Sequence, residues 1–158
     1  MDPIGYNSRG AVRVESGNRE DLDLAIEDFS KVLALDWNQK SAHYNRGAAK
    51  AKKGDVAGAI ADFTEEIEKY PEHAYAYMAR GSMRQELGDV KGAIADCSAA
   101  IKLDSRNYYA YSVRGMARAS TDPDGALSDF EEALNWAPPD WVNRSDVKRA
   151  IEELRRPR

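Results

Sequence analysis

The sequence predicts an all-α protein built as a solenoid of stacked helical hairpins. The first observation is a repeat: Gly47, Gly81 and Gly115 each follow an arginine and are spaced by 34 residues. The second is a Gly-Asp pair inside the repeat, at 54–55 and 88–89, between segments with helical periodicity. Such a glycine can end one helix in the left-handed conformation, and the aspartate can cap the next helix. Because a single hairpin cannot bury its apolar face, the hairpins are expected to stack.

Two short blocks recur along the chain in the same order. The first carries the Arg-Gly pair, and the second reads Ala-Ile-x-Asp-Phe with small variations. The first block is found at 7–10, 44–47, 78–81 and 112–115, and the second at 25–29, 59–63, 93–97 and 126–130. The blocks divide the chain into repeats at about 3–39, 40–73, 74–107 and 108–140. We therefore expect a single domain over residues 1–158.

Each repeat is expected to hold two helices joined by a tight turn. The helical segments lie at about 40–53, 56–69, 74–87, 90–103 and 108–121. The fourth repeat replaces Gly-Asp by Asp122-Pro123, where the aspartate caps a helix and the proline takes its first position. The glycine of each Arg-Gly pair has no side chain, so we expect it to let the two helices of a hairpin approach closely.

The repeat pattern stops after Pro138-Pro139, and a ninth helix is expected at about 145–155. Its apolar residues Val147, Ala150, Ile151 and Leu154 fall on one stripe, as in a helix that packs on one side only. Residues 141–156 are therefore predicted to form a capping helix over the open apolar end of the last hairpin.

These features resemble the tetratricopeptide repeat family, whose 34-residue helix–turn–helix unit carries aromatic, Ala and Phe positions at fixed offsets. The aromatic position holds Tyr6, His43, Tyr77 and Tyr111, and the Phe position holds Phe29, Phe63, Cys97 and Phe130. Arginine replaces the family's leucine in all four copies, which looks like the Arg-Gly variety common in bacterial arrays. The resemblance implies a right-handed superhelix, an α-solenoid whose first helices line a concave surface that holds another protein.

Composition argues against several classes of function. The net charge of the 158 residues is −4, whereas a dedicated nucleic-acid binder normally shows a basic field. No apolar run approaches the roughly 20 residues that cross a bilayer. Residues 1–18 lack the charged and apolar segments of a secretory signal. We expect a cytoplasmic protein that binds no nucleic acid, has no membrane span and uses no cofactor.

Residues able to carry catalysis or bind metal are sparse. The histidines, His43 and His73, have no cysteine or acidic neighbour at a metal-ligand spacing, so a metal site is not expected. Cys97 takes the Phe position and is expected to be a buried, inert thiol. The acids Glu66 and Glu131 are expected on a solvated convex face. Because no phosphate-binding loop or nucleophile motif is present, we do not expect an enzyme.

Charges of both signs repeat in register. An arginine precedes each repeat glycine, a second cation follows four residues later, and each second block holds an aspartate. These residues are Arg9, Arg46, Arg80 and Arg114; Arg13, Lys50, Arg84 and Arg118; and Asp28, Asp62, Asp96 and Asp129. One interpretation is a basic ladder for an anionic ligand. The regular pairing favours interhelical ion pairs instead, made within a hairpin or to the preceding one.

The stripe of the first helices that would face the concave side is poor in charge and rich in small residues. Positions i, i+3, i+7 and i+10 share one face of a helix. The candidate partner-binding residues are Asn7, Tyr44, Asn45, Tyr75, Met78, Ser82, Gln85, Tyr109, Ser112 and Met116. Three tyrosines are predicted as apolar anchors and the amides and hydroxyls as hydrogen-bond partners, although part of the stripe is expected to pack between neighbouring helices. The sequence thus predicts an adaptor or scaffold that binds an extended peptide or a partner helix.

A known subclass of the family grips the C-terminal carboxylate of chaperones through lysine, asparagine and arginine side chains. The matching positions in this chain are Asn7, Ala11, Asn45, Tyr75 and Ala79. Only Asn45 agrees fully with the subclass, so this carboxylate clamp is not expected.

Two other functions stay open. The first is a self-assembling scaffold, because Gly5 and Gly10 lie in a first helix that no preceding hairpin covers. The second is an accessory interaction domain of a larger protein. In either case the partner is a protein or peptide whose identity the sequence does not give.

Overall fold

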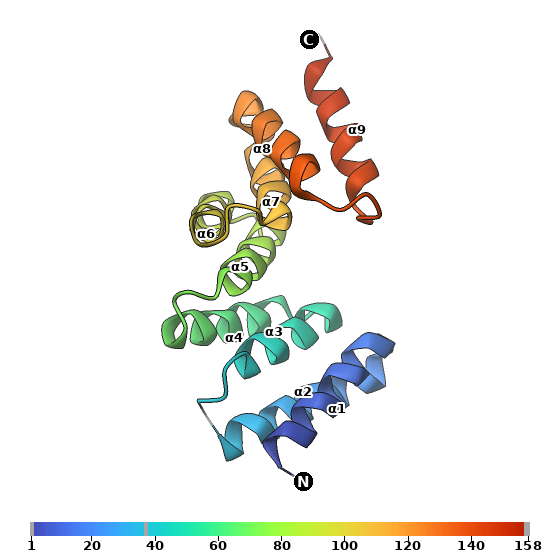
Figure 1. Ribbon diagram of the computed structural model, residues 1–158, viewed down its shortest axis with the longest axis vertical. Helices are drawn as coiled ribbons and strands as arrows, with labels where there is room; N and C mark the ends of the chain where they lie inside the picture. The colour runs from blue at the N-terminus through green and yellow to red at the C-terminus, as the bar shows by residue number, and fades with distance from the viewer. Residues whose placement is uncertain (1, 37, 157–158) are drawn as a thin grey trace.

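The computed structural model describes residues 2–36 and 38–156, in which nine helices follow one another and no strand is found. The helices are α1 (Pro3–Ser16), α2 (Arg19–Leu35), α3 (Ala42–Lys53), α4 (Val56–Lys69), α5 (Ala74–Glu86), α6 (Val90–Leu103), α7 (Tyr108–Arg118), α8 (Pro123–Trp136) and α9 (Arg144–Arg155). The first eight pair as consecutive hairpins that stack in chain order along the long axis, and α9 follows the last hairpin (Figure 1). The all-α fold of four hairpins and a terminal helix is confirmed.

The turns inside the hairpins have the geometry that the sequence predicts. Gly54 ends α3 in the left-handed region with φ of 90°, and the carboxylate of Asp55 accepts a hydrogen bond from the backbone N–H three residues later at 2.9 Å. In the fourth hairpin Asp122 accepts the corresponding bond at 3.0 Å, and Pro123 takes the first position of α8. α7 ends at Arg118 rather than near residue 121, because the N–H groups of the next turn bond back to the Arg118 carbonyl.

The glycine of each Arg-Gly pair lies against the Phe position of its own hairpin. A Cβ at Gly47 would stand 2.8 Å from Cε1 of Phe63, which is closer than real Cβ atoms come. At Gly81 it would stand 2.9 Å from Sγ of Cys97, which replaces the phenylalanine. The predicted packing role of the glycine is confirmed. Burial raises the pKa of the Cys97 thiol to about 12, so this side chain stays protonated and unreactive.

The repeated charges form ion pairs within each hairpin. Asp62 is buried, and it receives Nη2 of Arg46 at 2.7 Å and Nζ of Lys50 at 2.8 Å. Each of the other three repeats shows the same pair of cations on its aspartate: Arg9 and Arg13 on Asp28, Arg80 and Arg84 on Asp96, Arg114 and Arg118 on Asp129. Two cations around one buried carboxylate fix the register of the two helices.

The same arginines also tie each hairpin to the one before it. Nη1 of Arg46 donates to a hydroxyl of the preceding second helix, Oγ of Ser30, at 3.3 Å. The same bond recurs from Arg80 to Thr64 at 3.1 Å and from Arg114 to Ser98 at 3.0 Å. One guanidinium therefore joins three helices, because its planar fork offers several donors in fixed directions.

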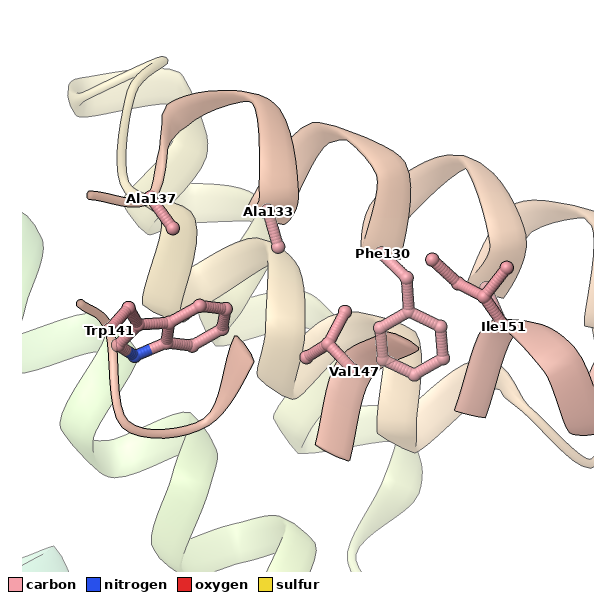
Figure 2. Packing of buried hydrophobic residues seen from close by; sticks show 7 residues of the cluster. Phe130, Ala133, Ala137, Trp141, Val147 and Ile151 are labelled. Atoms are coloured by element: carbon pink, nitrogen blue, oxygen red, sulfur yellow. The ribbon is translucent and has the colours of Figure 1, made fainter. Parts of the chain in front are cut away.

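α9 covers the end of the last hairpin, as the sequence predicts. The buried side chains Trp141, Val147 and Ile151 point toward α8 (Figure 2). Two tyrosines of α7 meet the Trp141 ring edge-on, with centroid distances of 5.3 Å for Tyr108 and 5.6 Å for Tyr109. The helix therefore seals the apolar core of the array at its C-terminal end.

Candidate binding groove

Three hollows open between successive first helices, and together they form one face of the array, which we call the groove. Each hollow has at its base the Phe ring of a second helix, and its walls are small or flexible side chains. The base rings are Phe29 between α1 and α3, Phe63 between α3 and α5, and Phe130 between α5, α7 and α9. The three hollows thus lie over the three Phe positions that hold phenylalanine, and the third repeat has Cys97 at this position.

Alanines make the hollows accessible. Ala11 and Ala48 border the first hollow, and Ala48 and Ala51 border the second. The Phe rings below are buried, with 1–2% of their surface exposed, so a ligand would meet the small side chains of the walls first. A segment lying along the groove could place one side chain in each hollow without displacing a large residue of this chain.

Six of the predicted site residues line the hollows or stand exposed beside them, and Asn45 is the one at the first hollow. Met78 and Ser82 line the second hollow, and Gln85 and Met116 line the third. Tyr75 and Met116 expose 50% and 47% of their surface, respectively, so both can meet a ligand without rearrangement. Aromatic and methionine side chains of this kind are enriched in protein interfaces.

Two of the predicted tyrosine anchors pack against their own chain. The ring of Tyr44 lies 5.0 Å from His73 and 5.7 Å from Phe63, and burial raises the pKa of its hydroxyl. The ring of Tyr109 lies between Tyr108 and Trp141 of the cap. Both rings are half-buried, so they offer a ligand less surface than Tyr75 does.

Asn45 and the two remaining predicted residues, Asn7 and Ser112, are also engaged with the protein itself. Nδ2 of Asn45 donates to Oδ1 of Asn7 at 3.1 Å, which joins α1 to α3 across the first hollow. This bond leaves the NH2 group of Asn7 and the carbonyl oxygen of Asn45 available to a ligand. Ser112 is buried at the base of a pocket between α7 and α9.

A family model described as tetratricopeptide repeat matches residues 17–69 and 44–108, which together span more than half of the chain. The chain belongs to the tetratricopeptide repeat family. A search of curated protein sequences returned no significant match.

Solved structures show the same tetratricopeptide repeat fold. A crystal structure of MamA protein is 22% identical and superposes with a TM-score of 0.76, covering 96% of this chain and 85% of MamA. YrrB, described as a TPR protein with an unusual peptide-binding site, is 23% identical with a TM-score of 0.71, covering 98% of this chain and 79% of YrrB. The first TPR of Spaghetti (RPAP3), bound to the HSP90 peptide SRMEEVD, is 26% identical with a TM-score of 0.66. The match covers 74% of this chain and 94% of the RPAP3 chain. These matches establish the superhelical scaffold, a fold that is typically non-catalytic.

The sequence prediction for Glu66 is wrong. Its side chain is 0% exposed rather than solvated, because it takes the core position that Val32, Ala100 and Ala133 fill in the other repeats. The carboxylate accepts backbone N–H groups of Ser41 at 3.1 Å and Tyr44 at 3.3 Å, and Oε1 lies 2.8 Å from Nδ1 of His73. It therefore caps the start of α3 from outside, where Ser41 has a positive φ of 67° and makes no side-chain cap.

The contribution of α9 to the groove was not predicted from the sequence. Ala150 and Leu154 line the third hollow together with Met116, although the sequence pattern indicates only a capping role for this helix. The stripe of α9 that packs on α8 also reaches the edge of this hollow. The apolar stripe could have indicated this contribution. α9 packs on α8 in the same way that each first helix packs on the second helix before it.

One charged residue lines each hollow of the groove: Glu15 at the first, Lys52 at the second and Glu153 at the third. Lys52 lines the second hollow, and its ammonium group donates to the carbonyl of Val14 at the end of α1. At two positions where the carboxylate clamp needs cations, the chain has Tyr75 and Ala79. In the part of the chain that the structure describes, no three or more metal-ligating side chains come together, and no helix has the length and apolar content of a membrane span.

Proposed function

We propose that this tetratricopeptide repeat protein is an interaction adaptor that binds an extended peptide or a partner helix along the groove. The row of alanine-walled hollows over Phe29, Phe63 and Phe130 carries this proposal. A bound segment would bury apolar side chains in the hollows, and burial of apolar area is the main source of affinity in such interfaces. Tyr75 and Met116 would add contact at the rim.

Polar groups beside the hollows would set the direction of the bound segment. Ser82 and Gln85 lie on one face of α5, and Asn45, which is bonded to Asn7, keeps its carbonyl oxygen available at the first hollow. A few such groups fix orientation while the apolar contacts supply most of the energy. A groove of this size supports a transient complex, on the order of micromolar in dissociation constant.

The chemistry of the groove favours a weakly charged partner over an acidic C-terminal tail. The related RPAP3 domain is bound to a peptide that ends in Glu-Val-Asp. In this chain Tyr75 and Ala79 stand where the clamp for such a tail has cations, and the ammonium group of Lys52 is engaged by a backbone carbonyl. We therefore propose an apolar segment with few charges, and no catalytic role.

Affinity capture with matched variants tests the proposal. Ser82→Glu places a charge at the second hollow, whereas Ala61→Glu places the same charge on α4, at an exposed position away from the three hollows. Partners recovered by the wild type should be kept by Ala61→Glu and lost by Ser82→Glu, provided that circular dichroism shows both variants folded. Equal recovery by the two variants would show that the groove does not bind these partners.

Self-association is the second candidate function, because Ile4 and Val12 are apolar and exposed on α1. Sedimentation velocity over a wide range of protein concentration separates the two functions. A self-assembling scaffold gains mass as the concentration rises, whereas an adaptor stays monomeric in the absence of its partner.

A further inference from the structure

The outer face of α1 has the composition of an internal repeat interface that lacks its partner. α3, α5 and α7 each pack on the second helix of the preceding hairpin, and α1 is the first helix of the first hairpin (Figure 1). We call the face of α1 that corresponds to those packed faces the open end. It consists of Gly5, Ser8, Arg9 and Val12.

One apolar residue of the open end corresponds to a residue of each internal interface. Counted from the glycine of each Arg-Gly pair, Val12 corresponds to Ala49, Met83 and Ala117. Ala49 and Ala117 are buried and Met83 is partly buried, whereas Val12 is 66% exposed. An apolar residue has thus been placed where the other hairpins bury one, yet nothing in the described chain covers it.

Arg9 shows the same incomplete interface in its hydrogen bonds. Like the other repeat arginines, it uses Nε and Nη2 to hold the aspartate of its own hairpin. In Arg46, Arg80 and Arg114 the remaining Nη1 donates to a hydroxyl of the preceding second helix. No hydroxyl within the described residues reaches Nη1 of Arg9, and its side chain is 39% exposed, against 13–22% for the other three.

The filled interfaces show what the missing helix must carry. In three second helices an Ala-Ile pair is followed, four residues after the isoleucine, by a hydroxyl residue: Ser30, Thr64 or Ser98. The hydroxyls of Ser30 and Thr64 donate to the carbonyl four residues back, at 2.7 and 2.8 Å, so their lone pairs remain for the arginine.

The second helix of the fourth hairpin, α8, provides an internal control. There the hydroxyl position holds Glu131, and the helix that comes after it, α9, lacks the Arg-Gly pair. Glu131 pairs instead with Arg155 of α9 at 2.7 Å. At this position of the second helices, a hydroxyl therefore occurs only where an arginine of the next hairpin donates to it.

We propose that the open end docks an amphipathic helix of a partner protein that carries Ala-Ile-x-x-x-Ser or Ala-Ile-x-x-x-Thr. The helix lies across Val12 and Gly5 and presents its hydroxyl to Nη1 of Arg9. A folded second copy has no such helix to offer, because α2, α4 and α6 are covered by the next first helix and α8 by α9. This surface is distinct from the groove, so an adaptor could hold two partners at once.

A synthetic helix tests the proposal directly. The probe is an acetylated, fluorescently labelled peptide with the sequence of residues 55–71, stapled on its solvent face and shown to be helical by circular dichroism. Fluorescence anisotropy should show saturable binding to the full chain. Changing the threonine of the probe to valine should weaken binding by about fivefold or more, because the arginine loses its acceptor.

Two variants of the protein locate the binding. Val12→Glu should weaken it by about tenfold or more, since a carboxylate would be desolvated against apolar side chains, and the exposed position lets the variant fold. Ser82→Glu in the groove should leave the affinity unchanged, which separates this proposal from the groove function. A helical probe that does not bind, or that binds Val12→Glu as tightly as the wild type, overturns the proposal. So does self-association that Val12→Glu abolishes, because the occupant is then a second copy.

Discussion

The two ends of the array are built from the same repeat but finish in opposite ways. At the C-terminal end Trp141 and the α9 residues Val147 and Ile151 are buried (Figure 2). The other face of α9 presents charged side chains to solvent. At the N-terminal end α1 presents Ile4 and Val12 to solvent. Val12 occupies a position that is buried or partly buried elsewhere in the array, so the difference lies in the neighbouring helix rather than in the position.

This difference shows how a repeat protein distributes its stability. Each hairpin contributes half of every interface it makes, and the adjacent element in the chain contributes the other half. A position is therefore buried or exposed according to the helix that packs beside it. Residue identity adapts where the neighbour changes, as at Glu131, which meets Arg155 of the cap instead of a repeat arginine.

The largest expected effect comes from removing a buried side chain at the covered end. Trp141→Ala should lower the free energy of unfolding by about 3 kcal/mol, because a large ring is lost from a packed aromatic cluster. Val12→Ala at the open end should change it by about 0.5 kcal/mol or less. Urea unfolding followed by circular dichroism measures both, and comparable losses would mean that the two ends are covered alike.

A smaller effect is expected from the ion pairs that hold each hairpin in register. Asp62→Ala leaves Arg46 and Lys50 without their buried carboxylate and should cost about 2 kcal/mol, reduced from the fully buried case because both cations are partly exposed. Glu72→Ala breaks an exposed pair with Lys40 and should cost about 0.5 kcal/mol or less. Thermal melts of the two variants make the comparison, and equal shifts in melting temperature would rule out a structural role for the repeat aspartates.

The smallest effect is expected at low pH, where the ion pair between Arg9 and Asp28 in the first hairpin should stop contributing to stability. The hydrogen bond from Arg9 is the main cause that lowers the pKa of Asp28, so the folded state binds a proton there less readily than the unfolded chain. The stabilisation is complete above the unfolded carboxyl pKa, about 3.9, and is lost as pH falls through the lower folded pKa. The difference in melting temperature between wild type and Asp28→Asn should therefore shrink below about pH 4. A difference that stays constant down to pH 2 would show that Asp28 has no depressed pKa.

Much of the fold can be predicted from the sequence because the repeat supplies its own alignment. The register of the Arg-Gly pairs predicts the hairpins, and the Gly-Asp and Asp-Pro pairs predict where helices end. The charges that repeat in register also predict that Asp62 and its equivalents pair with cations. These features depend on residues close in sequence or one repeat apart, which a single chain displays directly.

The sequence carries less information about how deeply each groove residue is covered. Helical periodicity places Tyr44 and Tyr109 on the groove side, but their burial depends on His73 and Trp141, which lie on other elements. The charge of Glu66 predicts a surface position, although its alignment with Val32 points to the core. The choice of partner-binding residues remains a prediction.

The adaptor function is tested most directly by an NMR titration of the isotope-labelled chain with the partner segment recovered in the capture experiment. The groove account predicts that amide shifts change at Ala48, Ala51, Met78 and Ser82, around the second hollow, while the exposed face of α4 around Ala61 stays unchanged. Shift changes confined to the α4 face, with the hollows unaffected, would contradict it.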